Sequence, residues 1–149
     1  MNGIHWDTSC VLAPYPPEVF SSQIASRAVA ENQPLTSSTI LEYEMTFALH
    51  AKEARGELGR GKASSVLDKF EDDIRRGRFT LAPLGKDIQI RAVEITRAIL
   101  RKKHPSLLRT LDGLHLATAL ELQSTELLTA DRRMATAARL LDLSVTEFP

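Results

Sequence analysis

The stretch ELLTADRRMATAARLLDLSVTEF, residues 126–148, contains two short strand-like runs on either side of a helical segment. ELLTA (126–130) and SVTEF (144–148) have the composition of strands, and the residues between them suit a helix. Strands that alternate with helices of this length indicate parallel βαβ units. This stretch therefore predicts an α/β fold built on a parallel sheet.

The same alternation continues through the rest of the chain. The earlier strand candidates are Ile4–Asp7, Pro34–Ser38 and 78–84. Helices are predicted over 18–32, 39–55, 63–77, 85–104 and 111–122. Parallel crossovers put helices on both faces of a sheet, so we expect a three-layer α/β/α architecture with five parallel strands. Residues 13–18 (APYPPE) are expected to form a proline-rich loop.

Composition limits the classes of protein that fit. The chain has 149 residues, 43% of them hydrophobic and 26% charged, which is typical of a globular domain. It contains no repeat or long linker, so we expect residues 1–149 to form one domain. A single cysteine excludes an internal disulfide. Without a signal-peptide pattern or a long apolar run, we expect a cytoplasmic protein with no membrane partner.

Charge is distributed unevenly along a chain whose net charge is zero. Residues 74–110 hold ten Lys and Arg against two acids, so this segment is +8 and the remainder −8. Such asymmetry is compatible with a surface that faces a polyanion such as RNA. Solvated helix faces explain the same pattern, and both interpretations stay open.

Four acidic residues fall at one predicted edge of the sheet. Asp7 ends the first strand, and Asp131 directly follows the strand at 126–130. Asp112 opens the helix that leads into that strand, and Glu44 lies about one turn into the helix after the second strand. Ligands of open α/β sheets bind beyond the carboxyl ends of the strands. We therefore predict that the four carboxylates share one crevice.

Each acid also has a purely local explanation. Asp7 suits an Asx-turn, and Asp131 is a favoured N-cap for the helix after it. Asp112 could cap a helix that begins at Gly113, and Glu44 could be an exposed helix residue. Taken singly, these explanations compete well with a site. Taken together they are weaker, because all four acids fall on the same edge.

Four neighbouring carboxylates need a countercharge. They would repel one another and raise one another's pKa values. Mg²⁺ and Mn²⁺ prefer oxygen ligands, whereas the sequence has no Cys/His cluster suited to zinc. One or two such ions can activate water and stabilise the leaving oxygen of a phosphodiester. The pattern predicts a magnesium or manganese site that acts on a polyanion.

Several neighbours of the acids are candidates for supporting roles. Ser9 and Thr129 are placed to hydrogen-bond a carboxylate, and helix capping is the alternative for both. His115 lies on the same helix face as Asp112, three residues on, and is interpreted as a supporting residue rather than a catalyst. Three arginines are candidates for contacts with RNA phosphates, or else solvated helix residues: Arg109, Arg132 and Arg133.

These residues match a known family. WDTS (6–9), SSTILEYEMTFAL (37–49) and most of 108–145 resemble PIN-domain ribonucleases, in particular VapC-type toxins of toxin–antitoxin pairs. Matched residue by residue, the family's acidic quartet falls on Asp7, Glu44, Asp112 and Asp131. Glu44 fits better than Glu42 because the family's helical acid precedes an xxxAL sequence. The first strand departs from the family pattern, since His5 stands among residues that are usually bulky and apolar.

The resemblance carries further expectations. It implies a parallel sheet in the order 3-2-1-4-5 and a Mg²⁺- or Mn²⁺-dependent endoribonuclease. It also implies a homodimer inhibited by a cognate antitoxin protein. A PIN-like binding module with little or no activity is the main alternative. An aspartate-based phosphotransferase is the other, although no lysine stands at a suitable strand end.

Overall fold

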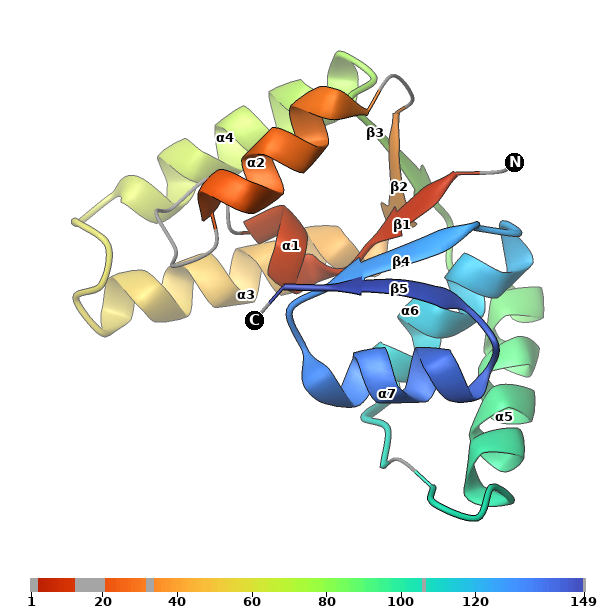
Figure 1. Ribbon diagram of the computed structural model, residues 1–149. Coiled ribbons are helices and arrows are strands. Elements are labelled where there is room, and N and C mark those ends of the chain that lie inside the picture. Colours follow the sequence, from red (N-terminus) through yellow and green to blue (C-terminus); the bar gives the residue numbers. More distant parts are fainter. Residues whose placement is uncertain (1–2, 13–20, 32–33, 106, 149) are drawn as a thin grey trace.

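The sheet has the predicted five strands in the predicted order. The computed structural model describes residues 3–12, 21–31, 34–105 and 107–148. The strands in this part are β1 Ile4–Trp6, β2 Leu35–Ser38, β3 Phe79–Ala82, β4 Glu126–Thr129 and β5 Ser144–Glu147. They form one parallel sheet in the order β3-β2-β1-β4-β5 (Figure 1). The predicted fold class and strand order are confirmed.

The helices lie close to their predicted ranges. Those in the described residues are α1 Thr8–Leu12, α2 Ser21–Ala30, α3 Ile40–Ala54, α4 Lys62–Arg75, α5 Lys86–Leu100, α6 Thr110–Glu121 and α7 Arg132–Leu140. The predicted proline-rich loop at 13–18 lies outside the described residues. Helix α1 was not predicted. It begins directly after β1, where the Asp7 carbonyl accepts hydrogen bonds from the backbone N–H groups of Cys10 and Val11.

Each face of the sheet has its own core. Helices α1–α4 lie on one side of the sheet and α5–α7 on the other (Figure 1). Two consecutive residues of β4 show the division, because Leu127 packs with α5–α7 and Leu128 packs with α1–α4. Trp6 of β1 is fully buried in the core on the side of α1–α4, together with Leu128. The molecule therefore has the expected three layers.

The central strands bring two chain segments together at one edge. β1 lies between β2 and β4, where the order of strands along the chain reverses. Trp6 pairs with Leu128, and the Asp7 N–H donates to the Leu128 carbonyl over 3.0 Å. The starts of α1 and α7 follow these two strands directly. This edge is where sequence reasoning placed the acids.

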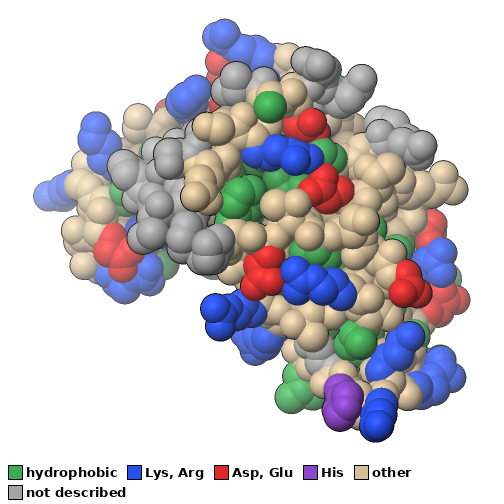
Figure 2. Space-filling view, in the orientation of Figure 1, with side chains coloured by type: hydrophobic (Ala, Val, Ile, Leu, Met, Phe, Trp, Pro, Cys, Tyr) green, Lys and Arg blue, Asp and Glu red, His purple; other side chains and the backbone are tan. Residues whose placement is uncertain are grey.

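The surface is polar and mixed in charge. Figure 2 shows acidic and basic side chains interspersed over one face, with Lys and Arg gathered around the end of α5 and the loop after it. In the described part of the chain, no helix is both long enough and apolar enough to cross a bilayer. Large hydrophobic side chains are nonetheless exposed on α3, where Tyr43 and Phe47 flank Glu44.

Candidate active site

Asp7 lies buried at the centre of the edge. Its Oδ2 accepts hydrogen bonds from Ser9 Oγ at 2.6 Å and from Thr129 Oγ1 at 2.8 Å. Both hydroxyls are themselves held by backbone donors, Ser9 by the N–H of Ala130 and Thr129 by the N–H of Asp131, each over 3.0 Å. The side chain of Asp7 is therefore fixed by groups from α1 and from the end of β4. Ser9 and Thr129 contact a carboxylate, one of the two roles considered for them.

Two further acids share one arginine, and we call Arg109, Asp112 and Asp131 the Arg109 side of the site. Arg109 Nε lies 2.9 Å from Asp112 Oδ2, and its Nη2 lies 3.3 Å from Asp112 Oδ1. The same Nη2 donates to Asp131 Oδ2 over 2.8 Å. The guanidinium thus bridges two carboxylates that are far apart in the sequence.

The local explanations for these two acids have different outcomes. Asp131 is the N-cap of α7, because its Oδ1 accepts from the backbone N–H groups of Arg133 and Met134. Its Oδ2 still faces Arg109, so the cap and the site use different oxygens. Asp112 does not cap a helix that begins at Gly113. Helix α6 begins at Thr110, and Asp112 lies in its first turn.

Glu44 is held in a second cluster, which we call the His115 side: His5, Thr8, Glu44 and His115. Glu44 Oε2 accepts hydrogen bonds from Thr8 Oγ1 and from His115 Nε2, the latter over 2.6 Å. The other ring nitrogen of His115 shares a hydrogen bond with His5 Nε2 at 3.3 Å. The side chain of His115 is only 1% exposed and lies inside the molecule, whereas that of Glu44 is 21% exposed. Glu42, by contrast, is exposed.

The pKa shifts connect the two sides. Burial alone would lower the pKa of His115, but the hydrogen bond to Glu44 and the charges of Asp7, Glu44 and Asp112 raise it. Burial would raise the pKa of Glu44, but His115, Thr8 and Arg109 together lower it. The hydrogen bond and charge of Asp112 raise the pKa of Arg109, and Asp131 and Asp7 add to this. The positive charge of Arg109 therefore acts on all four acids.

The second histidine responds differently. His5 is fully buried, and burial together with the nearby His115 lowers its pKa well below the usual value. Among the described residues its Nδ1 has no hydrogen-bond partner. Sequence reasoning did not include His5 in the site. The available signal was a polar residue in a strand where the family pattern has an apolar one.

The donor set suits a hard divalent cation. All four acids supply carboxylate oxygens, the ligands that Mg²⁺ and Mn²⁺ prefer. In the described part of the chain, no three His, Cys, Asp or Glu side chains are arranged to hold a metal ion. The contacts account for this, because Arg109 engages Asp112 and Asp131 while His115 and Thr8 engage Glu44. A guanidinium occupies the position of a cation between two of the acids.

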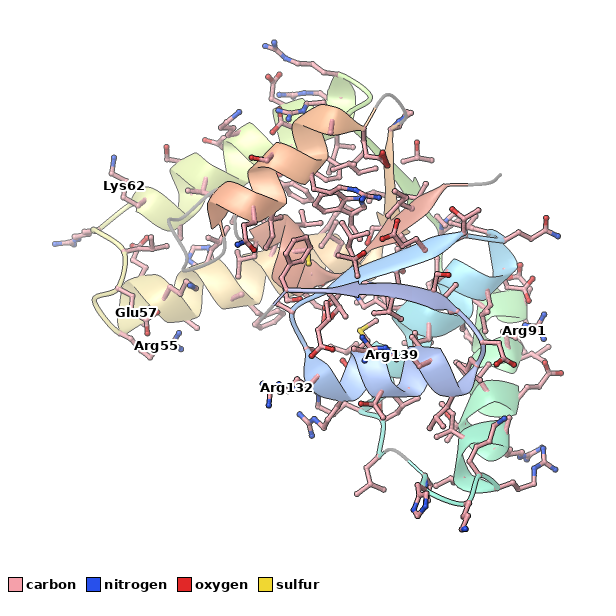
Figure 3. All side chains as sticks on the ribbon, viewed as in Figure 1. Arg55, Glu57, Lys62, Arg91, Arg132 and Arg139 are labelled. Atoms are coloured by element: carbon pink, nitrogen blue, oxygen red, sulfur yellow. The ribbon has the colours of Figure 1, made fainter. Side chains whose placement is uncertain are left out.

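The other predicted arginines lie at the rim. The side chain of Arg132 is 89% exposed, and its Nε lies 3.9 Å from Glu147 Oε1. Figure 3 shows Arg132 at the start of α7, pointing away from the body of the protein. Arg133 contributes its backbone N–H to Asp131. Arg109 contacts Asp112 and Asp131 directly through its side chain.

Comparisons with solved structures agree with the fold. Solved structures with the same fold include VapBC2 from Rickettsia felis bound to a promoter DNA fragment (16% identity, TM-score 0.67, 98% of each chain covered). FitAcB from Neisseria gonorrhoeae is 19% identical, with a TM-score of 0.69 over 97% of this chain and 96% of that one. VapC20 from Mycobacterium tuberculosis, described as a sarcin–ricin loop cleaving toxin, is 14% identical, with a TM-score of 0.66 over 91% and 95%.

Sequence comparison identifies the family. A search of curated protein sequences finds no significant match. The solved structures share so little sequence identity with this chain that they show its fold alone. The family model of the PIN domain matches residues 4–140, which is most of the chain and includes all four acids of the site. This chain therefore belongs to the PIN domain family.

Proposed function

We propose that this protein is a divalent-metal-dependent endoribonuclease whose active site contains Asp7, Glu44, Asp112 and Asp131. One observation carries the proposal: hydrogen bonds link acids that come from four separate parts of the chain. Arg109 bridges Asp112 and Asp131. Thr129 links Asp131 to Asp7, and Thr8, the residue after Asp7, contacts Glu44. Membership of the PIN domain family supports it, as does the presence of the acids at the switch point of a parallel sheet.

The residues of the site have distinct roles in this proposal. The four carboxylates would hold Mg²⁺ or Mn²⁺, which supplies the positive charge that activates water and offsets charge on the leaving oxygen. Ser9 and Thr129 keep Asp7 in place through hydrogen bonds to Oδ2. His115 is a positioning residue for Glu44.

The RNA would be gripped by basic side chains around the acids. Arg109, Arg132 and Arg133 are the residues that we assign to this role, since each lies beside Asp131 in sequence or in space. The net charge of +8 over residues 74–110 adds a wider attraction for the phosphate backbone. In this proposal residues 1–149 act as one domain.

We further propose that the protein is the toxin of a toxin–antitoxin pair, acting in the cytoplasm. Structural neighbours include the VapBC2 complex, which is bound to DNA from its own promoter, and the FitAcB structure. VapC20 is described as a toxin that cleaves the sarcin–ricin loop. By likeness to them we expect a cognate antitoxin protein as the partner and a homodimer as the assembly.

A PIN-domain binding module without activity is the second candidate. The observation in its favour is the guanidinium of Arg109, which neutralises Asp112 and Asp131 without a metal ion. Such a module would keep the acids as a structural ion pair, and neither metal binding nor RNA cleavage would follow.

An RNA cleavage assay separates the two candidates. Purified protein, stripped of metal with a chelator, is incubated with total RNA with and without added Mn²⁺. The variants are Asp112→Asn and Glu44→Gln, and the matched control is Glu42→Gln, an exposed acid on the same helix. We expect cleavage by the wild type only with Mn²⁺, a loss of about 100-fold or more in both site variants, and a change of less than about twofold in the control.

Two results would contradict the proposal. One is a folded wild-type protein that cleaves no RNA with Mn²⁺ or Mg²⁺ present. The other is equal activity in Glu44→Gln and Glu42→Gln, since Glu44 alone of these two acids contacts the site. Circular dichroism spectra of every variant exclude misfolding as the cause of lost cleavage.

A further inference from the structure

We propose that Arg109 is a built-in competitor for the divalent cation: it closes the site in the metal-free protein and must leave when the metal binds. The inference rests on the proposed function, because it concerns the same acids. Its basis is the position of the guanidinium, which lies on both oxygens of Asp112 and on Oδ2 of Asp131.

In the metal-free protein, the positive charge of Arg109 offsets repulsion among the acids. Asp7, Asp112 and Asp131 are close enough to Arg109 that the negative charge of each raises its pKa. Without a countercharge these carboxylates would repel one another, and Asp112 is buried. A guanidinium suits the task, because its planar set of donors can reach two carboxylates at once. The guanidinium of Arg109 therefore supplies this positive charge from the chain itself.

The same contacts make Arg109 and a metal ion mutually exclusive. A metal ion shared by Asp112 and Asp131 needs oxygens that now accept from Nε and Nη2 of Arg109. It would also bring a second cation to the place of the first, and like charges this close repel. Metal binding must therefore break both ion pairs of Arg109, and their stability is subtracted from the metal affinity.

The position of Arg109 allows its side chain to move away from the two acids. Its side chain is 58% exposed, whereas that of Asp112 is 9% exposed, so the cation sits on the solvent side of the acids. Arg109 also lines an open groove of about 460 Å³ between α5 and α6, together with Arg97, Val93 and Leu114. A released guanidinium thus has room beside the site and loses little packing, as exposed ion pairs are weak.

Isothermal titration of the metal-free protein with Mn²⁺ tests the inference. The variant is Arg109→Met, which keeps the length of the side chain and removes the charge. The matched control is Arg97→Met, which removes the same charge from the same groove but touches neither acid. We expect Arg109→Met to bind Mn²⁺ about three- to tenfold more tightly than wild type, and the control to change by less than about twofold.

A second measurement observes the arginine itself. The ¹⁵Nε–¹Hε NMR signal of Arg109, assigned through bonds from the Arg109 backbone in the wild-type protein, should move when this protein is titrated with diamagnetic Mg²⁺. It should stop moving at the concentration that saturates the site. This readout requires neither RNA nor activity, and it also applies if the variant fails to fold.

The outcomes separate this inference from the proposed function. Equal Mn²⁺ affinity in wild type and Arg109→Met, or an Arg109 signal that stays unchanged at saturating Mg²⁺, overturns the inference alone. A wild-type protein and an Arg109→Met variant that both fail to bind Mn²⁺ contradict the metal-dependent function, and the inference fails with it.

Discussion

The acids of this site face two different side chains, an exposed arginine and a buried histidine. On the Arg109 side, Asp112 and Asp131 are bridged by a side chain that is more than half exposed. On the His115 side, Glu44 is held by a histidine that is fully enclosed and contacts a second buried histidine. The exposed contact can be exchanged for another cation at little cost, whereas the buried one is part of the core.

The difference teaches which half of the site is variable and which is fixed. Exposed ion pairs contribute little to stability and are screened by salt. Buried hydrogen-bonded groups are costly to remove, because their partners are left without hydrogen bonds. We therefore expect loss of His115 to affect folding and loss of Arg109 to affect metal binding. The following predictions test this division, beginning with the largest effect.

Removal of the buried histidine should have the largest effect on stability. His115→Ala leaves a cavity and takes hydrogen-bond partners from Glu44 and His5. We expect the free energy of unfolding to fall by about 2–4 kcal/mol in urea denaturation. The control is Leu111→Ala, an exposed position on the same helix, with an expected change within about 0.5 kcal/mol. A loss below about 1 kcal/mol for His115→Ala would show that the buried contacts are not part of the core.

Thr129 links Asp7 to Asp131, and its removal should have an intermediate effect. Its hydroxyl donates to Asp7 Oδ2 and accepts from the N–H of Asp131. Thr129→Val keeps the shape and removes both hydrogen bonds, so we expect a loss of about 1–2 kcal/mol in the same assay. Thr136→Val, the same change at an exposed site of α7, is the control. If the two variants are equally stable, the hydroxyl does not fix Asp7.

On the exposed side, Arg109→Met should change the stability of the metal-free protein by less than about 1 kcal/mol. The variant loses two ion pairs and leaves Asp112 and Asp131 to repel each other, but water screens this repulsion. The difference from wild type should shrink as NaCl rises from about 0.05 to 0.5 M, because salt screens exposed charges. A difference that is larger than the loss in His115→Ala, or that does not depend on salt, would reverse the comparison.

The smallest effect concerns pH, because the side chains stay in place and one proton changes. His115 has a raised pKa in the folded protein, so its contribution is complete below 6.5 and is lost as pH rises through the folded pKa. His5 has a lowered pKa in the folded protein, so its effect is to raise stability as pH rises towards 6.5. Above pH 6.5 this effect changes little. In metal-free protein we expect stability to fall as pH rises from 6.5 through the folded pKa of His115, and this fall to be absent in His115→Gln.

Unfolding curves measured by circular dichroism at several pH values check this prediction. If the stability of the wild type rises with pH above 6.5, the predicted direction of the His115 effect is wrong. Equal slopes in the wild type and in His115→Gln would show that His115 does not titrate in the folded state.

Much of the fold could be predicted because it depends on local patterns. Short apolar runs alternate with helical segments, and this is sufficient for a parallel sheet with helices on both faces. The order 3-2-1-4-5 came from family resemblance and is confirmed. Helix α1 was missed because Thr8–Leu12 is short and follows an Asp-Thr-Ser sequence that also suits a turn.

The site could be predicted only in part. Asp7 and Asp131 follow strands, so topology alone places them at one edge. The i,i+3 spacing of Arg109 and Asp112 favours their contact, whereas the contact of Arg109 with Asp131, 22 positions away, depends on the fold. The contact of His5 with His115 joins residues 110 positions apart. Such tertiary contacts carry no periodic signal, and for that reason the division of the site into an exposed and a buried half appeared only in the structure.

A crystal structure with Mn²⁺ and its anomalous signal tests the central claim most directly. The account predicts an anomalous peak bound by oxygens from the quartet of Asp7, Glu44, Asp112 and Asp131, with the guanidinium of Arg109 displaced from Asp112 and Asp131. An anomalous map without a peak at these carboxylates, with Arg109 still bridging Asp112 and Asp131, would contradict it.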